Sequence, residues 1–121
     1  MRRFFQAAAW ILLATIVALS LVPPQLRPVT VFSQTSEHFM IFMATGIAFA
    51  AGYSDRVSFR AITVGLVSFG TGIEVVQIMV PDRHARVSDF IIDAGALCIG
   101  VAVVVAVAWT KPLISRRRRQ L

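Results

Sequence analysis

Seven polar residues between positions 37 and 93 have side chains that could bind a polar ligand or pair with one another. They are Glu37, His38, Glu74, Gln77, Arg83, Asp89 and Asp93. Carboxylates, an imidazole, an amide and a guanidinium can form ion pairs and charge-assisted hydrogen bonds, which are stronger than hydrogen bonds between neutral groups. These residue types predict two alternatives, a pocket for a polar group or a clamp of ion pairs that joins neighbouring helices.

The spacing of these residues does not favour catalysis. His84, Ser88 and Asp89 have the side chains of a hydrolase triad, but they lie within one short segment that lacks a nucleophile elbow. The only cysteine, Cys98, lies inside an apolar run, so we expect a small core residue there rather than a disulfide or a metal ligand. We therefore expect no catalytic residue, and an enzyme that uses the carboxylates is kept as an alternative.

A metal site is also disfavoured by spacing. The residues that offer oxygen or nitrogen ligands to a divalent cation are Glu37, His38, Glu74 and Asp93. Their separations match neither the HExxH motif nor a comparable arrangement of metal ligands. We expect no metal and no cofactor.

Four long apolar segments must position the polar residues. Only 15% of the chain is charged, whereas a soluble domain has about 25%. A hydrocarbon core of about 30 Å requires roughly 20 apolar residues as a helix. The predicted spans lie at about 4–22, 37–53, 61–80 and 89–109. The sequence thus predicts one domain over 1–121, an all-α integral membrane four-helix bundle whose last span is closed by Lys111 and Pro112.

The first span has some features of a cleaved signal peptide. Arg2 and Arg3 give it a basic start, and Ala18 and Ser20 are spaced as at a cleavage site. Its apolar stretch of 19 residues exceeds the usual signal core of about 7–15 residues. We expect a retained helix.

The distribution of lysine and arginine predicts the orientation of the bundle. With both termini on one side, nine basic residues lie on that side and three on the other. Of the six acidic residues, only Asp55 lies on the side with nine basic residues. Cytoplasmic segments carry the excess of basic residues, so both termini are predicted to be cytoplasmic. The basic tail 111–121 is expected to contact anionic lipid head groups. Four of the twelve basic residues are the terminal run Arg116 to Arg119, and no basic patch is interleaved with exposed aromatics, which argues against nucleic acid.

This orientation places the seven candidates near the outer face. At a rise of about 1.5 Å per residue, Glu74 lies roughly 9 Å and Asp93 about 5 Å inside the outer boundary. A carboxylate that faces lipid costs about 2.5–3.5 kcal/mol, so both should face the bundle interior. Small residues at intervals of four should allow close helix packing; they are Ala44, Ala48, Gly52, Ala96 and Gly100.

An ordered set of short motifs resembles the VanZ-like family. The set is Ser20-Leu21-Val22-Pro23, Glu37-His38-Phe39 with Phe42, Glu74-x-x-Gln77, Pro81-x-Arg83, Ser88-Asp89, and Asp93 followed by Gly95-Ala96 and Gly100. It covers about 20–100. Many members have Asp-Lys where this chain has Gln34 and Thr35, and Asn at the position of Asp93, so this chain carries one more ionisable group.

The resemblance implies a bacterial plasma-membrane protein with a role in the cell envelope, since the family is named for a protein associated with teicoplanin resistance. It implies no known reaction. Our first hypothesis is a non-catalytic protein whose outward-facing cluster binds a wall-precursor lipid, a glycopeptide or a segment of a partner protein. The alternatives are a membrane enzyme or small transporter subunit, and a purely structural accessory subunit. The expected partners are the lipid bilayer and either another membrane protein or further copies of the chain, with no nucleic acid.

Overall fold

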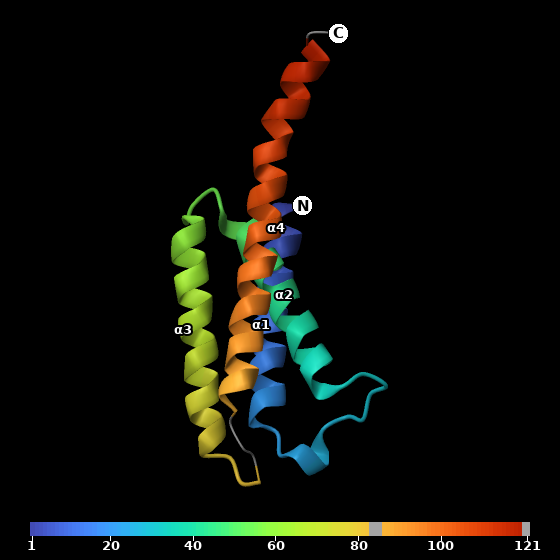
Figure 1. Cartoon of the computed structure of the whole chain (residues 1–121), viewed down its shortest axis with the longest axis vertical. Coiled ribbons are helices and arrows are strands. Elements are labelled where there is room, and N and C mark those ends of the chain that lie inside the picture. The colour runs from blue at the N-terminus through green and yellow to red at the C-terminus, as the bar shows by residue number, and fades with distance from the viewer. Residues whose placement is uncertain (83–85, 120–121) are drawn as a thin grey trace.

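The computed structural model describes residues 1–82 and 86–119, and the side chains up to residue 112 within those ranges. The described residues form four α-helices and one short 3₁₀ helix, arranged as in Figure 1. Their bounds are α1 Arg2–Leu21, η1 Pro24–Leu26, α2 Gln34–Tyr53, α3 Phe59–Ile78 and α4 Val87–Arg119. The described residues contain no strand, so the predicted all-α class is confirmed.

Local sequence signals fix where the helices begin and turn. The Ser33 hydroxyl accepts a hydrogen bond from the Ser36 amide at 3.2 Å, and Ser58 caps α3 in the same way through Ala61. Serine is favoured at this position because its oxygen satisfies an amide that has no partner within the helix. After α3, Asp82 adopts a positive φ of 61°, a conformation that Asp tolerates better than most residues. This residue turns the chain back toward α4.

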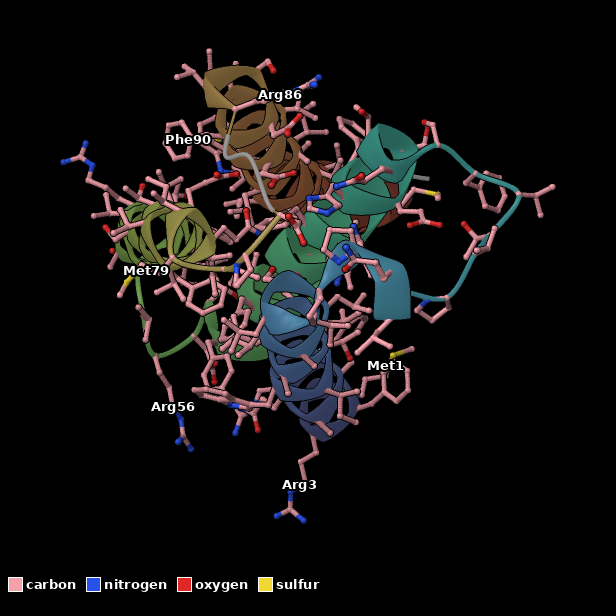
Figure 2. All side chains as sticks on the ribbon, turned by 90° about the horizontal axis from the view of Figure 1, so that it is seen from below. Met1, Arg3, Arg56, Met79, Arg86 and Phe90 are labelled. Atoms are coloured by element: carbon pink, nitrogen blue, oxygen red, sulfur yellow. The ribbon has the colours of Figure 1, made fainter. Side chains whose placement is uncertain are left out.

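Successive helices run in opposite directions, so the two termini emerge at the same end of the bundle (Figure 1). We call this end the terminal end; it also holds the α2–α3 connection, residues 54–58. The opposite end, here the loop end, holds residues 22–33 and 79–82. Figure 2 looks onto the loop end and shows α2 running through the middle of the bundle, with Arg3 and Arg56 extending away from it.

The bundle is built around α2, which packs against both α1 and α4. A Cβ atom added at Gly46 would lie 2.6 Å from the carbonyl oxygen of Leu97, and one added at Gly100 would overlap the backbone of Met43. The predicted close helix packing is therefore confirmed at Gly100. Of the other predicted small residues, Ala48, Gly52 and Ala96 are buried, whereas Ala44 is half-buried. Gly46 belongs to the same contact, although the interval of four did not identify it.

Polar contacts at the terminal end tie α1 to α2. Arg2 and Asp55 form an exposed ion pair. The side-chain amide of Gln6 donates to the carbonyl oxygen of Gly52 at 2.9 Å, and the Trp10 indole donates to the Tyr53 hydroxyl at 2.7 Å. These contacts hold the first helix in register, and they lie at the opposite end of the bundle from the described candidates.

Within the described chain, three helices are long and apolar enough to cross a membrane. They are α1, α3 and the Val87–Pro112 part of α4. Their outer surfaces keep large apolar side chains exposed, for example Ile11 at 65% and Ile91 at 62%. α2 has the same length, but its polar start, 34–38, lowers its mean hydropathy. The membrane crossing predicted for 37–53 therefore stays a prediction.

Two sequence-based predictions were wrong. Lys111 and Pro112 do not end the last helix, which continues to Arg119 with Pro112 inside it. A proline removes only one backbone hydrogen bond, and the Leu and Arg residues that follow are strong helix formers, so the helix resumes beyond it. Cys98 is exposed rather than in the core, because α4 is apolar on all sides and has no polar face to indicate which side packs inward.

Candidate functional site

A cavity of about 510 Å³ at the loop end brings most of the predicted polar residues together. Six of the seven candidates line it: Glu37, His38, Glu74, Gln77, Asp89 and Asp93. The seventh, Arg83, lies outside the described residues, as does His84. The cluster predicted from helix spacing therefore exists as one cavity for all of its described members.

Three helix ends supply these side chains. Glu37 and His38 lie one turn after the Ser33 cap, at the start of α2. Glu74 and Gln77 are three residues apart in the last turns of α3, and Asp89 and Asp93 are four apart at the start of α4. Residues three or four apart share one helix face. Because α2 and α4 begin where α3 ends, the antiparallel arrangement directs all three polar faces into the same space.

One contact within the cavity joins α2 to α4. His38 Nδ1 lies 3.4 Å from Asp93 Oδ2, and these side chains are 16% and 8% exposed. The His38 ring also stacks on Phe42, with a centroid distance of 6.2 Å, and Phe42 belongs to the core. The imidazole is thus fixed on one face by an aromatic ring and at one nitrogen by a carboxylate.

The second oxygen of Asp93 is the unusual atom of the site. Asp93 faces the bundle interior, as predicted, and its Oδ1 is buried without a hydrogen-bond partner among the described residues. A buried polar atom without a partner is costly, and such atoms are rare in native proteins. Oδ1 therefore offers a hydrogen-bond acceptor to a donor that enters the cavity.

Gln77 and Glu74 extend the polar surface along α3. Gln77 is 6% exposed, whereas Glu74 is half-buried. An amide offers both a donor and an acceptor, so Gln77 can contact a ligand of either polarity. The interior direction predicted for Glu74 agrees with its place in the cavity wall.

The prolyl loop between α1 and α2, residues 22–33, supplies a cavity residue that helix spacing did not identify, Arg27. Gln34 and Thr35, in the first turn of α2, also line the cavity, as do Asp82 and Arg86 of the α3–α4 connection. The side-chain amide of Gln25 donates to Asp82 at 3.4 Å, which joins this loop to the α3–α4 connection. The sequence feature that could have indicated a folded loop here is the presence of Pro23, Pro24 and Pro28. Their three fixed φ angles favour a rigid loop over a mobile one.

The described wall of the cavity carries more carboxylates than cationic groups. Five carboxylates line it, against the guanidinium groups of Arg27 and Arg86 and the imidazole of His38. Such a surface favours cations and hydrogen-bond donors. In the described chain, no three His, Cys, Asp or Glu residues are grouped so as to hold a metal ion.

No family model matches the chain, and neither the curated proteins nor the solved structures contain a match to it. The likeness to the VanZ-like family therefore rests on the quoted motif residues alone.

Proposed function

We propose that this chain is a VanZ-like, non-catalytic protein of the bacterial plasma membrane that binds a polar group of the cell envelope in its loop-end cavity. The three apolar helices support insertion in a bilayer. Together with α2, which would be the fourth span, they form a bundle in which five of the six acidic residues line the loop-end cavity.

One observation carries the binding proposal. Asp93 lines a 510 Å³ cavity, and its Oδ1 is buried with no partner among the described residues. A carboxylate that served only to clamp two helices would gain most by pairing both oxygens, since each unsatisfied one is costly. The free acceptor favours a ligand with an N–H or O–H donor.

The predicted orientation places this cavity on the outer face. Five basic residues with described side chains belong to the terminal end: Arg2, Arg3, Arg56, Arg60 and Lys111. Only Arg27 and Arg86 of the described chain belong to the loop end. By the positive-inside rule the terminal end faces the cytoplasm, and the cavity faces wall precursors and external glycopeptides.

A structural role has its own support in the His38–Asp93 contact, which joins α2 to α4. The two functions are compatible because the clamp uses Asp93 Oδ2, whereas the ligand would use Oδ1. By its family resemblance, the protein would contribute to envelope integrity and to the response to teicoplanin. A deletion strain with unchanged teicoplanin susceptibility would remove that part of the proposal.

The binding proposal is tested by native mass spectrometry of the full chain purified in mild detergent. Wild type should carry a bound molecule that survives purification, and Asp93→Leu should lose it while remaining helical and monodisperse. Ile91→Leu is the matched control, because this side chain is on the same helix and 62% exposed on the outside of the bundle. Equal occupancy in wild type and Asp93→Leu would contradict the proposal.

A further inference from the structure

A second, apolar groove adjoins the polar cavity. It has a volume of about 460 Å³ and lies between α1, α2 and the prolyl loop. Its apolar wall is formed by Leu12, Ile16, Leu19, Met40, Ile41 and Phe42. Both spaces are lined by Arg27, Pro28, Thr30, Phe32, Glu37 and His38. The two spaces therefore meet along one set of side chains, with a polar side and an apolar side.

This pairing suits a ligand that is itself amphipathic. A soluble polar molecule would fill the cavity and leave the groove empty, whereas a lipid has a chain for the groove and a head group for the cavity. In a bilayer, moving an acyl chain from lipid into an apolar groove yields little free energy, since both surroundings are apolar. The groove would thus admit the chain, and the polar cavity would select the head group.

Arg27 lies at the junction of the two spaces and is half-buried. Within the described chain, no carboxylate lies within ion-pair distance of its guanidinium. A guanidinium without a carboxylate partner is well suited to a phosphate, which it can bind through two parallel hydrogen bonds. In a phospholipid the phosphate occupies the corresponding place, between the acyl chains and the rest of the head group.

Beyond the junction the cavity is acidic. The buried Oδ1 of Asp93 lacks a donor among the described residues, and Asp89 and Glu74 line the same cavity. An ammonium group carries three N–H donors and a positive charge, which matches this surface. A head group with a phosphate and no cation would meet the excess of carboxylates and be disfavoured.

Building on the proposed function, we propose that the chain binds a phospholipid with a phosphoethanolamine head group that enters sideways between α1 and α2. Its phosphate contacts Arg27, its ammonium group contacts Asp93, and its acyl chain occupies the groove beside Met40. The polar envelope group of the preceding proposal is thereby assigned to a zwitterionic lipid of the surrounding bilayer.

The test uses the full chain in nanodiscs of equal parts phosphatidylethanolamine and phosphatidylglycerol. Native mass spectrometry measures which lipid stays on the protein after release from the disc. Wild type should retain phosphatidylethanolamine in preference to phosphatidylglycerol. Arg27→Gln should lower total phospholipid retention at least roughly tenfold, as expected when charged hydrogen bonds to the phosphate are lost. Asp93→Asn should abolish the preference for phosphatidylethanolamine over phosphatidylglycerol.

Groove occupancy is tested with a pair of tryptophan variants. Met40 is 44% exposed and lines the groove, so Met40→Trp should block the acyl chain without disturbing the core. Ile11 is 65% exposed and lies outside the groove, so Ile11→Trp is the control. Phospholipid retention should fall in Met40→Trp and stay at the wild-type level in Ile11→Trp.

A parallel titration with soluble O-phosphoethanolamine separates this inference from the proposed function. Wild type and Met40→Trp could bind the soluble compound equally and also retain the same lipids. The ligand would then enter from water. Lateral entry of a lipid would be wrong, and the binding function of the cavity would stand. If wild type shows no lipid preference, lipid selection is overturned. If wild type and Asp93→Asn bind neither lipid nor soluble compound, both proposals fail.

Discussion

Asp93 presents one carboxylate oxygen to His38 at 3.4 Å and keeps the other buried without a described partner. The first contact stabilises the junction of α2 and α4. The second leaves an acceptor that is expensive to bury, because its hydration is lost without a replacement. The Asp93 side chain thus stabilises the fold through Oδ2 and destabilises it through the unpaired Oδ1. This pattern is expected where a ligand supplies the missing hydrogen bond.

Substitutions at Asp93 should separate these two effects. Asp93→Asn keeps the volume and a hydrogen bond to His38, so we expect a loss below about 1 kcal/mol. Asp93→Leu leaves the 16%-exposed imidazole without its partner and should lower the free energy of unfolding by about 1–3 kcal/mol. Denaturant unfolding in detergent, followed by circular dichroism, measures both. A leucine variant as stable as wild type would mean that the His38–Asp93 contact contributes nothing to the fold.

Single residues also show where sequence reasoning stops. Intervals of three and four placed Glu74 with Gln77, and Asp89 with Asp93, on common faces, and the structure brings them into one cavity. Arg27 was not predicted at the site, because its position depends on how the prolyl loop folds back over the bundle. No periodicity in the sequence determines that path.

At the scale of the helices, the cavity depends on how closely α2 and α4 approach each other. Gly46 and Gly100 allow the two backbones to touch: added Cβ atoms there would overlap Leu97 and Met43 respectively. This contact lies toward the middle of the helices and sets the separation of His38 from Asp93 at their ends. In lipid, where burial of apolar surface gives little stabilisation, such close packing is a main source of helix association.

Two glycines of α4 give a matched test of this contact. Gly100→Ala should force α2 and α4 apart and lower the free energy of unfolding by about 1–3 kcal/mol, as overpacking does. Gly95 has no heavy atom within 4 Å of an added Cβ, so Gly95→Ala should be neutral or should stabilise by up to about 1 kcal/mol through helix propensity. Unfolding curves for both variants supply the measurement. Similar losses in the two would show that the close α2–α4 contact is not a determinant of stability.

The length of α4 shows a second limit of sequence reasoning. Pro112 was expected to end the helix, yet α4 extends to Arg119. Proline prevents its own backbone hydrogen bond but leaves the following residues free to continue the helix. A helix boundary can therefore be predicted reliably where a capping residue and a change of chain direction coincide, as at the N-caps Ser33 and Ser58. A proline alone does not predict a boundary.

For the whole molecule, hydrophobic pattern and connectivity were sufficient for most of the architecture. Long apolar runs separated by proline and charge predicted four helices, and short connections made their order antiparallel. The inward and outward faces of α4 were harder, because its apolar residues surround the helix, and Cys98 was placed inside although it is exposed. The apolar groove also depends on tertiary packing between α1, α2 and the prolyl loop, which pattern alone does not encode.

The orientation of the bundle is a property of the whole chain and has a direct test. The nine-to-three distribution of basic residues predicts that both termini are cytoplasmic. A reporter fused after Leu121 should be active in the cytoplasm, and one inserted between α3 and α4 should be active outside. The reverse pattern would place the cavity on the cytoplasmic side and contradict a role in binding external envelope groups.

The central claim is that a water-accessible cavity, and not the outer surface of the bundle, receives the ligand at the external end. Cysteine labelling tests it with two neighbouring residues of α3 in a Cys98→Ser background. Gln77 is 6% exposed and lines the cavity, whereas Val75 is 57% exposed on the outside of the bundle. Thiols react as thiolates, which form in water and not in hydrocarbon.

A membrane-impermeant maleimide should therefore be added to intact cells that carry either Gln77→Cys or Val75→Cys. If the cavity is open to external water and the outer surface faces lipid, as proposed, Gln77→Cys should be labelled at least roughly tenfold faster. Faster labelling of Val75→Cys would contradict the account, since it would show that the outside of the bundle faces water and that the cavity is closed to the external solution.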